Sequence, residues 1–139
     1  MKRRNYITKL MSSTVELDES TVLYHPSVRE AKYYFGLLNK YLFQNKLTAG
    51  KIRITKLRGC WGWFVGWDDG FEIKMTDKYP SVRVFIMALA HEMVHQYQWE
   101  VDGIEDLKQG KTPNISHGPG FYAWKDTLSE FNIPLKIRY

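Results

Sequence analysis

Apolar side chains in the stretch "PSVREAKYYFGLLNKYLFQNKL" recur at alternating steps of three and four residues. The positions concerned are Val28, Ala31, Phe35, Leu38 and Leu42. This spacing stacks them on one face, so the stretch predicts an amphipathic helix. Ser27 and Glu30 form a capping-box pattern, which predicts that the helix begins directly after Ser27.

The period changes to two between positions 51 and 76. The segments "KIRITKL" and "FEIKM" each place apolar residues on one face, as expected of strands. Between them, "GCWGWFVGWDDG" alternates bulky residues with a glycine-rich face and ends in a turn signal. The region therefore predicts a small three-stranded sheet. We expect Trp61, Trp63 and Trp67 to pack in the core, which is the more common use of alternating aromatics, rather than to line a binding surface.

The stretch "PSVRVFIMALAHEMVHQYQW" is apolar nearly all round in its first half, which predicts a central, buried helix. The polar segment "DGIEDLKQGKTPN" then predicts a long loop. A final helix is expected from Pro119, with apolar residues at steps of three and four up to Phe131. The order of helix, three strands, helix, loop and helix predicts an α+β domain.

The length of 139 residues suits one domain, and no internal repeat is visible. We expect residues 1–25 to form an N-terminal tail and residues 26–139 to form the domain. The longest apolar run, "VFIMALA", is much shorter than the ~18 residues of a membrane span, and the N-terminus lacks the apolar core of a signal peptide. We therefore expect a cytoplasmic protein that does not enter a membrane.

Charge and cysteine content narrow the chemistry further. A formal net charge of +5 makes nucleic acid a plausible partner, although the basic residues are spread along the chain and a solvated basic surface would have the same composition. The single cysteine, Cys60, excludes an intrachain disulfide and a cysteine-based zinc finger. Any bound metal must be held by histidines and carboxylates.

Two histidines with helical spacing lie in the expected buried helix, in "HEMVH". His91 and His95 are four positions apart, which places both imidazoles on one face, one turn apart, where they can share one Zn²⁺. Glu92 projects about 100° away and can reach a metal-bound water as a general base. Alternatively, the three residues are surface or core residues without a common role. The apolar residues before them favour the metal site, because buried ionisable groups need a partner.

A catalytic zinc site needs a third protein ligand. The extended zinc-peptidase pattern with a glycine and a histidine after the second histidine fails, because Gln98 and Val101 occupy those positions. His25 and His117 remain, together with three glutamates, namely Glu100, Glu105 and Glu130. His117 is preferred because it lies in "SHGPGF", directly before a helix that must pack on the domain. His25 lies in the expected tail.

With these motifs the chain resembles the SprT-like zinc metallopeptidases, a family that includes the protease Spartan. The resemblance rests on "HEMVH" and "HGPGF", with "YLFQNKL" near the end of the first helix and a glycine-containing segment before "IKMTDKY". It covers about residues 28 to 131. It implies a zincin-like minimal metalloprotease core within residues 26–139, with Zn²⁺ bound by His91, His95 and His117 and with Glu92 as the catalytic glutamate.

The function expected is that of a zinc metalloendopeptidase, in which Glu92 is the general base for a zinc-activated water. In the related family the activity is proteolysis, and Spartan acts on proteins crosslinked to DNA. The partners implied are therefore a protein substrate and DNA. Tyr97, Tyr122 or an arginine are candidates to stabilise the oxyanion. The alternatives are a non-catalytic zinc-containing module that binds nucleic acid and a zinc hydrolase that acts on a non-peptide bond.

Overall fold

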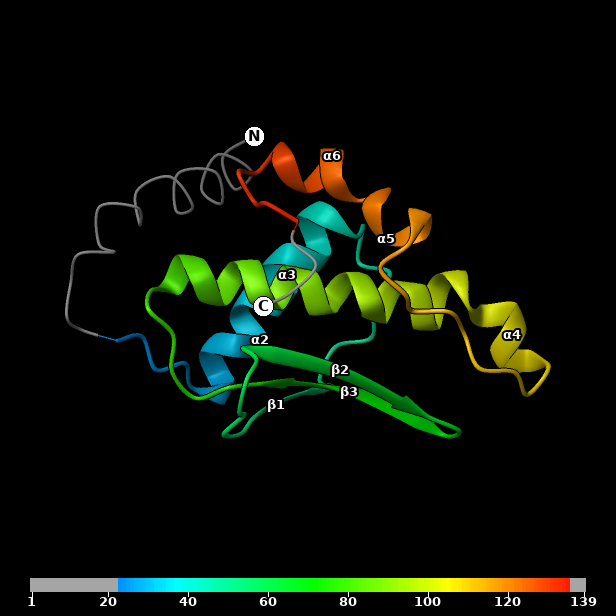
Figure 1. Ribbon diagram of the computed structural model, residues 1–139, viewed down its shortest axis with the longest axis horizontal. Coiled ribbons are helices and arrows are strands. Elements are labelled where there is room, and N and C mark those ends of the chain that lie inside the picture. The colour runs from blue at the N-terminus through cyan, green and yellow to red at the C-terminus, as the bar shows by residue number, and fades with distance from the viewer. Residues whose placement is uncertain (1–22, 136–139) are drawn as a thin grey trace.

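The computed structural model describes residues 23–135, and these residues form an α+β fold with one three-stranded sheet. The elements in chain order are α2 (Val28–Leu42), β1 (Ile52–Ile54), β2 (Gly62–Trp67), β3 (Gly70–Met75), α3 (Val82–Tyr97), a π-helical turn (Gln98–Asp102), α4 (Ile104–Lys108), α5 (Pro119–Tyr122) and α6 (Lys125–Ser129). The α+β class and the three strands predicted from the sequence are confirmed. Figure 1 shows the sheet on one side of α3 and the two C-terminal helices on the other.

Serine side chains cap both long helices. The Ser27 hydroxyl accepts from the Glu30 N–H, and the Glu30 carboxylate accepts from the Ser27 N–H, each at 3.1 Å. This is the predicted capping box, and α2 begins directly after it. At the start of α3, the Ser81 hydroxyl accepts from the Val84 N–H at 3.3 Å. Each cap satisfies backbone donors that have no partner within the helix.

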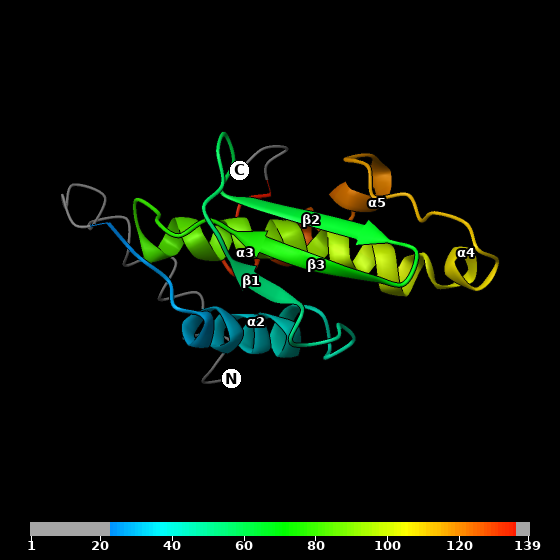
Figure 2. The ribbon, with the colours of Figure 1, turned by 90° about the horizontal axis from the view of Figure 1, so that it is seen from below.

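The sheet has the strand order β1-β3-β2, with β1 parallel and β2 antiparallel to β3. As a result β2 is an edge strand, and Figure 2 shows it on the same side of β3 as α5. The inner face of the sheet carries the buried side chains Phe64, Ile73 and Met75. These residues face α3, and α2 packs beside α3 and β1.

Helix α3 lies in the centre of the domain. Every residue from Phe85 to Gln96 is buried, including the two histidines and the glutamate of "HEMVH". This confirms the buried helix predicted from the sequence. It also means that any polar group on α3 needs a partner supplied by the surrounding elements.

Two of the three tryptophans expected in the core are on the surface instead. Trp63 is 56% exposed and Trp67 is 45% exposed, on the outer face of β2. The glycines of this strand face inward, where neighbouring side chains leave no room for a Cβ atom. A Cβ at Gly66 would lie 2.6 Å from the Trp99 ring, and one at Gly62 would lie 2.9 Å from Glu92 Cγ. Large residues and glycines alternate along β2 as predicted. However, Trp63 and Trp67 lie on the outer face and not in the core.

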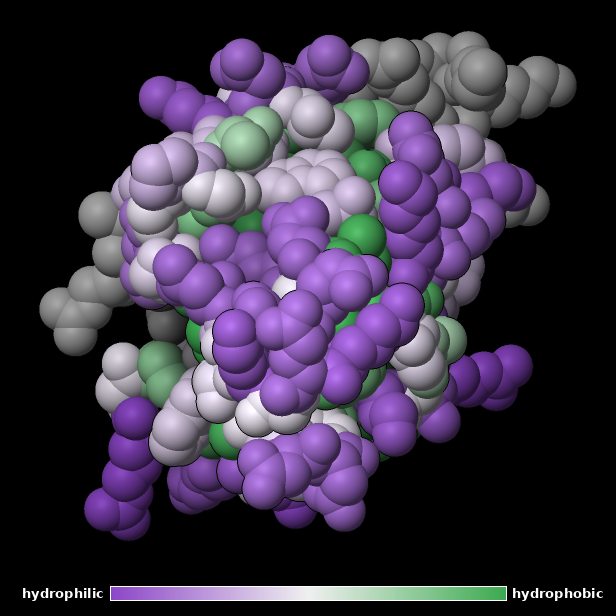
Figure 3. Space-filling model, turned by 90° about the vertical axis from the view of Figure 1, so that its right-hand side faces the viewer, coloured by the Kyte–Doolittle hydropathy of each residue, from purple (hydrophilic) through white to green (hydrophobic). Residues whose placement is uncertain are grey.

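The C-terminal third differs from the expected loop and single helix. The expected loop contains α4, whose residues are all at least partly exposed, and Figure 3 shows mainly hydrophilic side chains over this end of the molecule. The expected final helix is divided into α5 and α6. It breaks near Trp124, whose ring packs 4.7 Å from the Phe43 ring and 4.8 Å from the Tyr97 ring between centroids. The break lies beside these contacts, and the repeat of apolar residues does not indicate it.

The predicted N-terminal tail lies mostly outside the described residues, of which residue 23 is the first. Tyr24 pairs with Tyr79 through two backbone hydrogen bonds of 2.8 Å. Between residues 23 and 135, none of the helices has the length and apolar content that a membrane crossing requires.

Candidate metal centre

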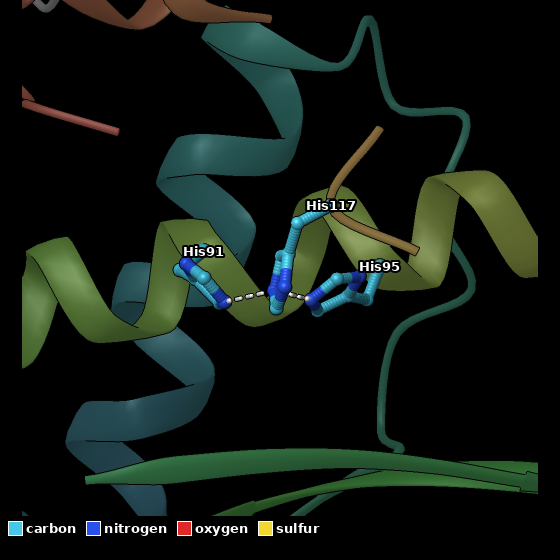
Figure 4. Close-up of side chains that lie close together, drawn as sticks. All are labelled: His91, His95 and His117. Atoms are coloured by element: carbon cyan, nitrogen blue, oxygen red, sulfur yellow. Dashed lines mark hydrogen bonds between the residues drawn. The ribbon is translucent and has the colours of Figure 1, made fainter. Parts of the chain in front are cut away.

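Three histidines from two segments converge beside the sheet. His91 and His95 extend from α3, and His117 extends from the loop before α5, as Figure 4 shows. The Nε2 atom of His117 lies 3.1 Å from His95 Nε2 and 3.4 Å from His91 Nε2. His91 and His95 are buried, whereas His117 is exposed. One side of the cluster is therefore open to solvent.

The spacing of the three imidazoles fits a shared metal ion. Two nitrogens that each lie ~2.0–2.1 Å from one tetrahedral zinc are about 3.3 Å apart. The two measured Nε2 separations, 3.1 and 3.4 Å, are close to this value. A nitrogen of each ring lies within 4.8 Å of the others, so the three histidines could hold a metal ion. A set of three imidazoles suits zinc and other first-row transition metals.

Phe121 of α5 packs against all three imidazoles. Its ring centroid lies 4.9 Å from that of His91, 5.1 Å from that of His95 and 4.7 Å from that of His117. Phe121 is fully buried. Phe121 therefore forms one apolar wall of the cluster and contacts His117 as well, although His117 belongs to a loop.

The protonation of His95 also suits metal binding. Burial lowers the pKa of His95, the hydrogen bond with Gln98 opposes this effect, and His117 lowers the pKa further. A lowered pKa keeps the imidazole neutral near pH 7, which is the form that binds a metal.

Glu92 lies beside the cluster and is held by the edge strand. Its Oε1 accepts from the Phe64 N–H at 2.8 Å, and its Oε2 lies 3.9 Å from His91 Nε2. Burial raises the pKa of Glu92 to about 7, and the hydrogen bond from Phe64 limits the increase. A carboxyl group with this pKa exchanges protons near neutral pH, as a general base must.

A cavity of about 710 Å³ opens onto the histidines and Glu92. Its wall includes strand β2 from Gly62 to Phe64 and the preceding segment with Cys60. Cys60 is partly exposed. Lys78 is the one lysine or arginine in this wall among the described residues.

The other candidates from the sequence lie elsewhere. His25 Nδ1 contacts the Asp77 carbonyl at 3.1 Å. The Glu100 carboxylate accepts from the Thr48 N–H and hydroxyl at 2.6 and 2.7 Å. Tyr97, considered for the oxyanion, packs against Trp124 and is not part of the cavity wall. Of the candidate third ligands, His117 is the one that the structure places with His91 and His95.

Two contacts of the site lie outside what the sequence predicts. The contact between Glu92 and the Phe64 N–H joins residues 28 positions apart, and no periodicity indicates it. Gln98 hydrogen-bonds His95, with 2.8 Å between Oε1 and Nδ1. The spacing of three residues on one helix was a usable signal for this second contact.

Comparisons with protein-family models and with curated proteins find no match for this chain.

Proposed function

We propose that this protein is a zinc-dependent peptidase with a zincin-like core of the SprT-like type. The observation that carries the proposal is the placement of Glu92 beside an open cluster of three histidines in one cavity. A structural zinc site usually has four protein ligands, whereas three ligands leave a position for water or substrate. Among the described residues, no fourth histidine, cysteine or carboxylate belongs to this cluster.

His91, His95 and His117 would hold the zinc through their Nε2 atoms. A zinc ion with three protein ligands lowers the pKa of water and polarises a carbonyl group. Glu92 takes a proton from the attacking water at its carboxylate and passes it to the leaving amine. The Phe64 N–H keeps this carboxylate at the cluster, and the raised pKa of Glu92, about 7, allows it both to accept and to release the proton.

The edge of β2 that does not pair with β3 is suited to an extended peptide on either side of the Phe64 N–H, which Glu92 occupies. The register pairs Trp63 with Lys74 and Val65 with Glu72, and the Phe64 N–H points away from β3 to Glu92. Because backbone groups alternate along a strand, those of Gly62 and Gly66 point to the same free edge. A substrate that adds to this edge as a further strand lies along the cavity that holds the histidines. Lys78 is the candidate to stabilise negative charge on the carbonyl oxygen.

DNA-associated proteins are the proposed substrates. This part of the proposal rests on the resemblance to the SprT-like family and on the net charge of +5. The outer face of the sheet does not concentrate that charge, because Glu72 lies 3.2 Å from Arg53 and 3.8 Å from Lys74. We therefore expect DNA to act through the bound protein substrate or through other basic segments.

The test compares the wild type with Glu92→Gln, both loaded with zinc. An unfolded protein and a DNA-binding protein serve as substrates, each without DNA, with single-stranded DNA and with double-stranded DNA. We expect Glu92→Gln to retain zinc and to lose cleavage by about 10²–10⁴-fold, the usual contribution of a general base. Equal cleavage by both proteins would remove Glu92 from the mechanism. Zinc binding without cleavage of either substrate by the wild type would support the non-catalytic alternative.

A further inference from the structure

Gln98 occupies a buried position between the two segments that supply the histidines. It follows α3 directly, is 5% exposed and lies three residues after His95. Its side-chain oxygen contacts His95 Nδ1 at 2.8 Å, and its side-chain nitrogen donates to the Ser116 carbonyl at 3.1 Å. Ser116 directly precedes His117. The Gln98 side-chain amide therefore contacts both His95 and the backbone of the residue before His117.

The chemistry of these two bonds fixes the direction of each hydrogen. The Ser116 carbonyl can only accept, so the NH₂ group of Gln98 must face Ser116. The Gln98 oxygen then faces His95 and can only accept, so Nδ1 of His95 must carry the hydrogen. In a neutral imidazole this leaves the lone pair on Nε2, the atom that faces His117. The Ser116 carbonyl thus determines, through Gln98, which nitrogen of His95 is free to bind a metal.

The second bond acts on the loop. Ser116 and His117 are both exposed, and the Ser116 N–H donates to Asn114 within the same loop at 2.9 Å. The bond from Gln98 connects this exposed segment to the buried end of α3. Removing it would allow the backbone at His117 to move away from the cluster.

We propose that Gln98 is a positioning residue of the metal centre, which selects the Nδ1–H tautomer of His95 and holds the loop that carries His117. The proposal rests on the proposed metal site, but it does not depend on peptidase activity. Groups that orient metal ligands typically contribute about 10- to 100-fold to metal affinity. We expect an effect of this size from Gln98.

The test measures zinc affinity by competition with a chelator in the wild type, Gln98→Met and Gln98→Glu. Methionine has similar size and forms neither bond, so we expect affinity to fall by about 10- to 100-fold. Glutamate restores an acceptor for His95, so we expect it to recover part of the loss. The Co²⁺ absorption spectrum, which reports ligand geometry, should change in Gln98→Met. Wild-type affinity in Gln98→Met, or an equal loss in both variants, would overturn the role given to the His95 bond.

Gln96→Met is the matched control. Gln96 is fully buried in α3, and its side-chain nitrogen donates to the Thr48 carbonyl and the Glu100 carboxylate, not to a histidine of the cluster. We expect this variant to lose thermal stability and to keep wild-type zinc affinity once folded. A loss of affinity equal to that of Gln98→Met would show that the effect is general destabilisation, and it would overturn the proposal.

A measurement on the wild type requires no variant to fold. Long-range ¹H–¹⁵N NMR spectra of the metal-free protein, at a pH where His95 is neutral, identify its tautomer. We expect Nδ1 to carry the hydrogen, and a hydrogen on Nε2 would contradict the proposal. If the wild type binds no zinc while His95 has the expected tautomer, the proposed function fails and the orientation of His95 by Gln98 stands.

Discussion

Glu92 is held in place by two different elements of the fold. It belongs to α3, but its carboxylate accepts a hydrogen bond from the backbone of β2 at Phe64. Its side chain is buried, and this burial raises its pKa to about 7. Burial on α3 alone would favour a neutral carboxyl group, and the bond from the strand favours the charged form that a base requires.

The raised pKa of Glu92 makes the stability of the metal-free protein depend on pH. A group with a pKa raised by folding stabilises the native state below its unfolded value of 4.5, and this contribution is lost as the pH rises through about 7. The cost of ionisation is on the order of 3 kcal/mol. Glutamine can still accept from the Phe64 N–H and has no such cost.

We therefore expect Glu92→Gln to melt at a higher temperature than the wild type at pH 8, with the difference decreasing towards pH 5. Thermal unfolding followed by circular dichroism, in the presence of a chelator, measures it. A melting-temperature difference that is constant between pH 5 and 8 would contradict the raised pKa.

Among the elements, strand β2 shapes the site because two residues on its inner face have no side chain. Gly62 leaves the space that Glu92 occupies, and Gly66 leaves the space that Trp99 occupies. Neither glycine has a positive φ, so close packing explains them, and backbone conformation does not. This explains why the tryptophans, which alternate with the glycines, lie on the outer face.

Gly62→Ala tests the fit between β2 and α3. The new Cβ would lie 2.9 Å from Glu92 Cγ and 3.0 Å from Met75 Sδ, so the Glu92 side chain must move. We expect cleavage to fall by about tenfold or more, because the base is displaced, while zinc affinity stays unchanged. Gly36→Ala is the control, because Gly36 is exposed on α2 and a Cβ there would meet no atom of another element within 4 Å. It should keep wild-type cleavage and gain about 0.5–1 kcal/mol of stability. Unchanged cleavage in Gly62→Ala would contradict this prediction, because it would show that displacing the Glu92 side chain does not reduce activity.

The long helices and the strands could be predicted from the sequence because their signals are local. The capping box at Ser27 and the two-residue period of the strands each depend on neighbouring residues. The break between α5 and α6 could not be predicted, because the apolar residues continue at helical steps across it. The short α4 was missed because five residues are too few for a helical period to be visible.

The candidate metal site also combines local sequence signals with contacts that only the tertiary structure shows. The four-residue spacing predicted that His91 and His95 share a face, and the position of His117 before a helix made it the preferred third histidine. The bond from Phe64 to Glu92 and the bond from Gln98 to Ser116 depend on how α3 meets the sheet and the loop. No local pattern contains that information.

At the scale of the molecule, a metal ion would join two distant parts of the chain. His91 and His117 are 26 positions apart, and the loop between α4 and α5 brings them together. A ligand that binds only the folded state stabilises it, by about 2.7 kcal/mol at a concentration 100 times its dissociation constant. Zinc binding should therefore be visible in the stability of the whole domain.

We expect added zinc to raise the melting temperature of the wild type and a chelator to reverse the increase. Differential scanning calorimetry at a series of zinc concentrations measures the effect, which should grow with the logarithm of free zinc. Magnesium is the control ion, because it prefers oxygen ligands. A melting temperature that does not respond to zinc would argue against the site.

Zinc bound per chain at equilibrium tests whether His91, His95 and His117 hold one metal ion. We compare the wild type with His117→Ala and with His25→Ala, whose ring contacts Asp77 away from the cluster. We expect one zinc per chain in the wild type and in His25→Ala. We expect a loss of affinity of at least about 100-fold in His117→Ala, with little change in metal-free melting temperature because His117 is exposed. Equal zinc binding by His117→Ala and the wild type would contradict the assignment of His117 as a ligand.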